Sequence, residues 1–147
     1  MANLTDILDA VVTKVKSISL AGISSANIKA RMLPKIHEEL DAVPCVIVST
    51  LRAEAWEPID MEGTDDIVYF VNVTIVAANN FDFVSESGVY FTWRERIRKA
   101  LEGHTLAGAP TVWQIDYAPD AVFDPAEFNN MYAYQPMVFE VHSAEVP

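Results

Sequence analysis

The chain has 147 residues, of which 51% are hydrophobic, and a formal net charge of −11. This apolar content supports one sizeable core and excludes intrinsic disorder, while the acidic excess argues against a surface that grips nucleic-acid phosphates. One cysteine, Cys45, excludes an intrachain disulfide, and the sequence shows neither a signal peptide nor an apolar run of the roughly 18 residues that span a membrane. We expect a single domain over residues 1–147 that folds in a reducing cytoplasm without membrane contact.

The first third of the chain predicts one helix and two strands. Apolar residues recur at helical spacing over residues 4–19, which predicts an amphipathic helix, and Gly22 is placed to stop it. A short strand is expected over 27–33. A β-branched run over 45–50 predicts an interior strand, which can continue as far as Pro58.

The middle of the chain predicts a long hairpin and a second helix. A polar, acidic turn over 60–66 precedes the clearest alternating strand, 67–78, so the two arms form an antiparallel hairpin with an acidic tip. A loop is expected over 79–88. The helix predicted over 89–101 is basic in its second half, which suits the negative end of the helix dipole.

The last third predicts two strands, over 112–117 and 132–143, joined by a polar connection over 120–130. Pro136 would place the final strand at an edge of the sheet or at a bulge. This order of elements predicts an α+β fold, with a mainly antiparallel sheet of four to five strands, two helices packed on one face and a long β-hairpin.

Residues with catalytic or metal-binding chemistry are scattered. The three histidines, His37, His104 and His142, lie in separate segments without HExxH spacing, and no GxSxG, P-loop or GxGxxG motif occurs. The acidic turn over 60–66 could offer oxygen ligands to calcium, but it departs from the EF-hand pattern in the position of its glycine and lacks the closing Glu. We therefore expect no catalytic residue, no cofactor and no bound metal, and a protein that is not an enzyme.

Charge is distributed unevenly along the chain. Between Ile36 and Trp93 there are eleven acidic residues and one basic residue, whereas the helix over 89–101 carries four of the ten Lys and Arg residues. Opposed charges of this kind can pair copies head to tail, and such contacts close into rings when the rotation permits. A surface that is charged for solubility is the alternative.

Tyrosine and tryptophan often anchor protein interfaces, so three of them join the charged candidates. The residues expected at interfaces with copies or partners are Arg52, Trp56, Asp60, Glu62, Asp65, Arg94, Arg96, Arg98, Lys99, Tyr132 and Tyr134.

The order of features has a further implication. An amphipathic helix precedes VPCVIV (43–48), an acidic hairpin leads into VYFVNVTI (68–75), and WRERIRKAL (93–101) precedes WQIDY (113–117) and the closing MVFEV (137–141). In this layout, over nearly the whole chain, the sequence resembles the tail terminator and neck proteins of long-tailed bacteriophages. The resemblance implies a ring, expected to be a homohexamer, at the head-proximal end of a tail tube, which ends tube polymerisation and joins the tail to the neck or connector.

The resemblance also implies partners and a location. The partners are further copies of the chain, the tail tube protein, neck or connector proteins and, if the tail is contractile, the sheath protein. DNA would pass through the ring without specific binding, which an acidic lumen favours by repulsion. The chain would assemble in the host cytoplasm and reside in the virion. Alternatives that stay open are another head–tail joining or tail-tube-related protein, and a small enzyme or ligand-binding domain with an unrecognised site.

Overall fold

The computed structural model describes residues 4–31, 44–50, 55–58, 65–78, 83–103, 105–118 and 132–145. Two helices and six strands are formed within these residues. In chain order they are α1 (Leu4–Ser17), a 3₁₀ turn η1 (Ser25–Asn27), β1 (Ile28–Ala30), β2 (Cys45–Thr50), β3 (Ala55–Pro58), β4 (Asp65–Ala78), α2 (Phe83–Leu101), β5 (Val112–Ala118) and β6 (Tyr132–Glu145). Neither helix among these residues is long and apolar enough to cross a membrane.

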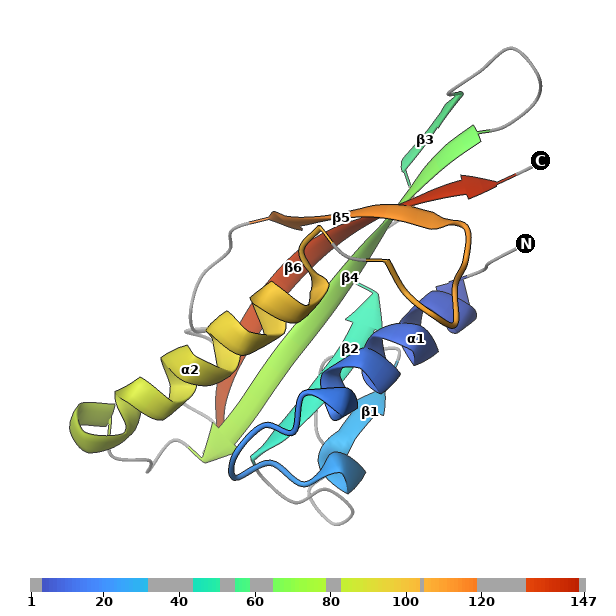
Figure 1. Cartoon of the computed structure of the whole chain (residues 1–147). Helices are drawn as coiled ribbons and strands as arrows, with labels where there is room; N and C mark the ends of the chain where they lie inside the picture. Colours follow the sequence, from blue (N-terminus) through green and yellow to red (C-terminus); the bar gives the residue numbers. More distant parts are fainter. Residues whose placement is uncertain are drawn as a thin grey trace.

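The strands form one twisted sheet in the order β1-β2-β4-β6-β5, and β3 pairs with β4 beside that path (Figure 1). β1 runs parallel to β2, and the other pairings are antiparallel. The predicted α+β class and the mainly antiparallel sheet are therefore confirmed. The longest pairing in the sheet joins β4 and β6 and runs from Asp65↔Glu145 to Ala78↔Tyr132.

The segment predicted as the first strand of the hairpin forms two strands, β2 and β3, which pair with the same edge of β4. Thr50 pairs with Val71 and Ala55 pairs with Val68, so these two pairs are four residues apart in the sequence on one side and two residues apart on β4. In a continuous ladder the residues of two strands pair one to one, so these unequal spacings interrupt the pairing between β2 and β3. β3, the first part of β4 and the last part of β6 project beyond the helices (Figure 1), and we call this projection the arm.

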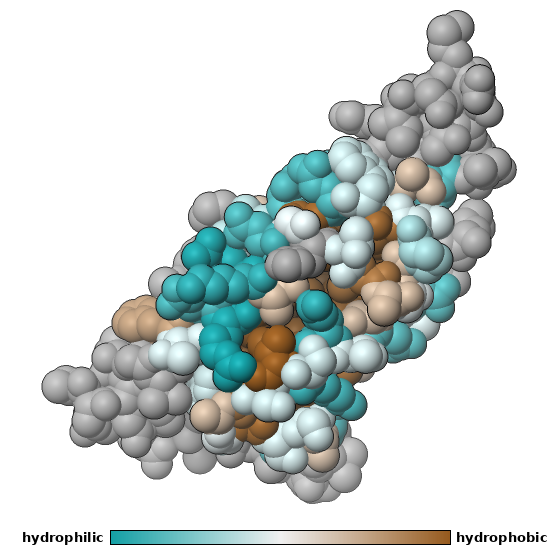
Figure 2. All heavy atoms as spheres, viewed as in Figure 1, coloured by the Kyte–Doolittle hydropathy of each residue, from teal (hydrophilic) through white to brown (hydrophobic). Residues whose placement is uncertain are grey.

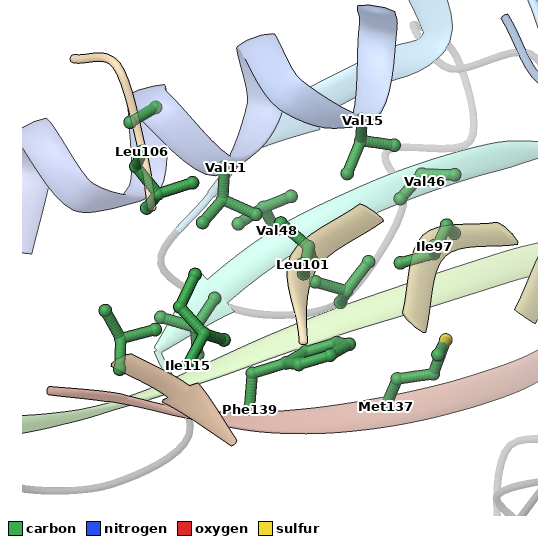
Figure 3. Close-up of a cluster of buried hydrophobic side chains, with 14 of the residues drawn as sticks. Val11, Val15, Val46, Val48, Ile97, Leu101, Leu106, Ile115, Met137 and Phe139 are labelled. Carbon is green, nitrogen blue, oxygen red and sulfur yellow. The ribbon is translucent and has the colours of Figure 1, made fainter. Parts of the chain in front are cut away.

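Both helices cover one face of the sheet, as predicted (Figure 1). Alternation in the central strands directs Val71, Val73 and Ile75 of β4 to that face, where they meet the apolar stripes of the helices. Figure 3 shows Val11 and Val15 of α1 and the α2 residues packing over side chains of the sheet. The labelled core residues are Val11, Val15, Val46, Val48, Ile97, Leu101, Leu106, Ile115, Met137 and Phe139.

The second face of the sheet is also buried over β2 and β4. Ile47 is 2% exposed, and Ser49, Asn72 and Thr74 are likewise buried. The Thr74 hydroxyl donates to the Asn72 side-chain oxygen over 2.8 Å, so these two polar groups satisfy each other inside the sheet. The sheet is therefore a buried layer in this region, which explains why β2 reads as a continuous apolar run.

Helix α2 begins earlier than the sequence predicted. The segment expected as a loop over 79–88 is helical from Phe83, so Gly88 lies inside the helix. Gly in a helix interior lowers helix stability by only about 1 kcal/mol relative to Ala. A helix that is already nucleated also extends at little cost in free energy, so the second half of α2, which packs on the sheet, can stabilise the added residues. Helix α1 is shorter than predicted, because it ends at Ser17 and Ser19 has a positive φ of 51°.

β6 as a whole lies between β4 and β5, against the expectation of an edge strand, but at Pro136 its described partner is β4 alone, so the expectation of a sheet edge holds at that residue. β5 pairs only with the part of β6 from Val138 onward, so Pro136 lies beyond the end of β5. Its carbonyl oxygen accepts from the Arg94 guanidinium, which places the backbone polar groups of Pro136 on the side facing away from β4. The missing N–H therefore removes no ladder hydrogen bond, and proline is tolerated in an interior strand.

Candidate interaction surface

The basic run of α2 was the first candidate for a partner interface, and the structure divides it between three roles. Arg94 is 9% exposed and lies over the sheet. Its Nη1 donates to the Pro136 carbonyl oxygen over 3.0 Å, and its Nη2 donates to the Tyr117 hydroxyl over 3.2 Å. Arg94 therefore ties α2 to both β6 and β5.

Arg96 contacts the end of the other helix. Its guanidinium donates to the carbonyl oxygen of Ile18 and, over 3.3 Å, to that of Ser19, directly after α1 ends. The last carbonyls of a helix lack partners within the helix and form its negative end, so a cation here is favourable. One turn earlier on α2, Trp93 donates from Nε1 to the carbonyl oxygen of Ala21 over 2.7 Å. The two side chains hold the segment after α1 against α2.

The last two cations form ion pairs within α2. Arg98 lies 3.4 Å from the Glu102 carboxylate, and Lys99 lies 2.8 Å from Glu95. The hydrogen bond from Lys99 and its charge lower the pKa of Glu95 below its ordinary value. All four side chains are exposed, and Figure 2 shows hydrophilic residues over α2. The contacts of Arg98 and Lys99 are to acidic groups of the same chain, and their role toward a partner stays a prediction.

The strand candidates fall into two groups at opposite ends of the β4–β6 ladder. Trp56 belongs to β3 and pairs with Ile67, and Asp65 opens β4 opposite Glu145. Tyr132 and Tyr134 lie at the far end of the ladder. A strand of this length spans roughly 45 Å, so the two groups cannot belong to one small patch of a monomer. Arg52, Asp60 and Glu62 lie outside the described residues.

The backbone register of the arm pairs acidic positions with one another. Glu57 of β3 pairs with Asp66 of β4, and the next position along, Asp65, pairs with Glu145 of β6. Like charges directly opposite each other on neighbouring strands destabilise a sheet. Glu145 is buried and accepts a hydrogen bond from the Tyr69 hydroxyl, and the role of the arm in an assembly contact stays a prediction.

The edge strand β5 carries a candidate that the sequence analysis missed. Trp113 is 49% exposed, one of two large hydrophobic side chains with high exposure among the residues described; the other is Phe91 of α2, at 50%. Edge strands leave backbone groups available to a further strand, and exposed aromatic side chains favour association. Strict alternation within 112–117 would have placed Trp113 on the face of the buried Ile115, but the register shift between Val112 and Gln114 leaves Trp113 exposed.

One groove lies between α1 and the segment that precedes β5. It has a volume of about 500 Å³ and is lined by the polar face of α1, chiefly Asp6, Asp9 and Lys14, and by residues 105–108. Its described lining residues offer carboxylates, one amine and the hydroxyls of Thr13, Ser17 and Thr105, but neither histidine nor cysteine.

Comparisons with known proteins add information on the fold. No known protein family matches the chain, and no curated protein sequence matches it either. The structure is similar to one chain of a solved assembly described as the virion of a native gene transfer agent particle, with a TM-score of 0.61. The two chains are 14% identical, and the similarity covers 95% of each. At this identity the likeness shows a shared fold.

Proposed function

We propose that this chain is a structural subunit of a phage-like virion, in which copies form a ring at the head-proximal end of the tail tube. The ring ends tube polymerisation and joins the tail to the neck or connector. The observation that carries the proposal is the fold, which matches a chain of a gene transfer agent virion from end to end, at 95% of both chains. The layout of the sequence, which resembles tail terminator and neck proteins, supports the same conclusion.

The charge distribution supports assembly into a ring. The arm projects beyond the helices and carries acidic residues opposite one another at Glu57↔Asp66 and Asp65↔Glu145 (Figure 1). A neighbouring copy could neutralise this end with a cationic surface, and a contact between two different surfaces of the same chain is the type that closes rings. A net charge of −11 also suits a lumen that lets DNA pass without binding it.

The proposed partners follow from this place in a tail. Further copies of the chain form the ring, expected to be a hexamer, and the tail tube protein binds one side of it. Neck or connector proteins bind the other side, and in a contractile tail the sheath protein also makes contact. Function resides in these surfaces, and the chain is proposed to be non-enzymatic and to reside in the virion.

The test is the mass and shape of the purified protein. Light scattering and negative-stain images should show a ring, either of the chain alone or after tail tube protein is added. The variant Asp60→Asn/Glu62→Gln removes two acidic charges from the sequence between β3 and β4, and it should weaken assembly without unfolding the domain. Asp6→Asn/Asp9→Asn on α1 removes the same charge elsewhere and should assemble normally. A protein that stays monomeric at all concentrations and ignores every tail component would overturn the proposal.

A further inference from the structure

Three metal-ligating side chains from two strands meet on the face of the sheet that is turned away from the helices. Asp116 of β5 and Glu140 and His142 of β6 place their ligand atoms all within 4.8 Å of one another. We call these residues the triad. Asp116 is far in sequence from Glu140 and His142, which are neighbours on one face of β6, so the meeting of the three follows from strand pairing.

The strand register explains why the triad forms. Asp116 pairs directly with Glu140, which puts two carboxylates side by side on one face. His142 lies two residues beyond Glu140 and therefore points to the same face, opposite Gln114. The ladder is irregular between Val112 and Gln114, where the extra residue is Trp113. Such irregularities re-aim side chains, and here the Trp113 ring lies 5.3 Å from the His142 ring.

Neighbouring groups hold two of the three ligands in place. Gln114 donates from Nε2 to both carboxylate oxygens of Asp116, over 2.9 Å each, which fixes the plane of the carboxylate. Trp113 packs against the imidazole at an interplanar angle of 56°. His142 Nε2 is enclosed from solvent and lies 3.2 Å from Asp116 Oδ2. Metal sites typically use such outer contacts to orient their ligands.

The geometry points to a site for a divalent transition-metal ion of the Zn²⁺ class, and we propose that the triad binds one. Two carboxylates balance the charge of a divalent cation and would no longer repel each other across the strands. A neutral imidazole selects zinc-like ions over Mg²⁺ or Ca²⁺, which prefer oxygen ligands. Bonds of about 2.0–2.1 Å in a tetrahedral site separate neighbouring ligand atoms by roughly 3.3 Å, close to the present distance from His142 Nε2 to Asp116 Oδ2.

A three-ligand site leaves one coordination position open. The Asp116 side chain is 47% exposed, so that position faces solvent at the β5 edge. Water can complete the site in a monomer, and a donor from another molecule can complete it in an assembly. Binding to the isolated chain requires no ring, so this inference stands or falls separately from the proposed function.

The test is metal titration of the full chain after treatment with a chelator. Calorimetry with Zn²⁺ should show one saturable site per chain, and Co²⁺ should give the visible absorption bands of a four-coordinate complex. His142→Ala should abolish both signals, and Glu140→Gln should weaken binding. Gln114→Leu, which releases Asp116, should lower the affinity about tenfold or more. Glu95→Gln and Asp9→Asn, exposed carboxylates outside the triad, should bind as the parent does.

Circular dichroism of each variant separates lost binding from lost folding, and His142→Gln is a second variant that keeps a polar side chain at this position. Absence of saturable Zn²⁺ binding, or unchanged affinity in a folded His142→Ala or His142→Gln protein, would overturn the proposal. In that case the triad is a surface ion pair between His142 and its carboxylates. Tight binding of Ca²⁺ without Zn²⁺ would likewise contradict the assignment of the metal class.

Discussion

The Tyr69 hydroxyl donates a 2.7 Å hydrogen bond to the Glu145 carboxylate, and this pair is buried where β4 and β6 leave the helix-covered core. Glu145 is only 4% exposed. A buried carboxylate is costly unless hydrogen bonds compensate it, so this contact joins the core to the base of the arm. The two residues are 76 positions apart, and the antiparallel ladder brings them together.

Replacing Tyr69 with Phe removes the donor and leaves the ring in place. We expect Tyr69→Phe to lower the free energy of unfolding by about 1.5–3 kcal/mol, because hydrogen bonds to charged groups contribute about this much. Urea denaturation followed by circular dichroism measures the change. Thr13→Ala, which removes an exposed hydroxyl bonded within α1, serves as the control and should change stability little.

Two arginines on α2 offer a direct contrast between buried and exposed cations. Arg94→Met should lower the free energy of unfolding by about 2–3 kcal/mol, because it leaves the Pro136 carbonyl and the Tyr117 hydroxyl without this donor. Arg98→Met removes an exposed pair with Glu102 and should cost no more than about 0.5 kcal/mol. Equal stabilities of the two variants in urea would show that the buried contacts of Arg94 contribute nothing.

Arg96 is expected to act locally at the end of α1. Arg96→Ala removes the cation beside the last carbonyls of that helix and should lower stability by about 0.3–1 kcal/mol. Hydrogen exchange should accelerate most at residues 15–20, whereas β6 should exchange as in the parent. Arg96→Lys keeps the charge and should recover most of the protection, and uniform acceleration across the sheet would contradict a local role.

The pair of Lys99 and Glu95 gives a prediction for pH. The pKa of Glu95 is lowered by the Lys99 hydrogen bond and charge, so Lys99→Met should raise it toward its ordinary value of 4.5. Since the folded pKa is depressed, the stabilisation is present above the ordinary pKa and is lost as the pH falls through the folded value. Carboxyl carbon chemical shifts followed by NMR measure the shift, and added salt should shrink it because both groups are exposed. An identical titration curve in Lys99→Met would contradict the assigned cause.

Much of the fold could be predicted because its signals are periodic. The alternation of β4 and the apolar stripe of α1 identified both elements and the faces that they bury, since local spacing decides which side chains share a face. The length of α2 was missed because the helix penalty of Gly88 is offset by the packing of α2. The interior place of β6 was missed because the penalty of Pro136 depends on its position within the sheet.

The candidate site residues were also predicted only in part from the sequence. The sequence identified a basic run on α2, and only the structure assigned Arg94 to the sheet and Arg96 to the end of α1. His142 was interpreted as a surface residue in an isolated segment, and Trp113 was not singled out. Strand pairing placed His142 beside Asp116, and Trp113, the extra residue at one irregularity in the ladder, lies against the His142 ring.

By itself, the amino-acid sequence determined the class of this protein: an acidic chain with enough alternating and helical apolar pattern to build one α+β core. Only the tertiary structure decided the order of the strands, the partners of the charged residues and the meeting of Asp116, Glu140 and His142. The reason is physical. Periodicity expresses contacts between near neighbours along the chain, whereas strand order and side-chain clusters depend on contacts between residues far apart in sequence, whose free energies are realised only when the whole sheet forms.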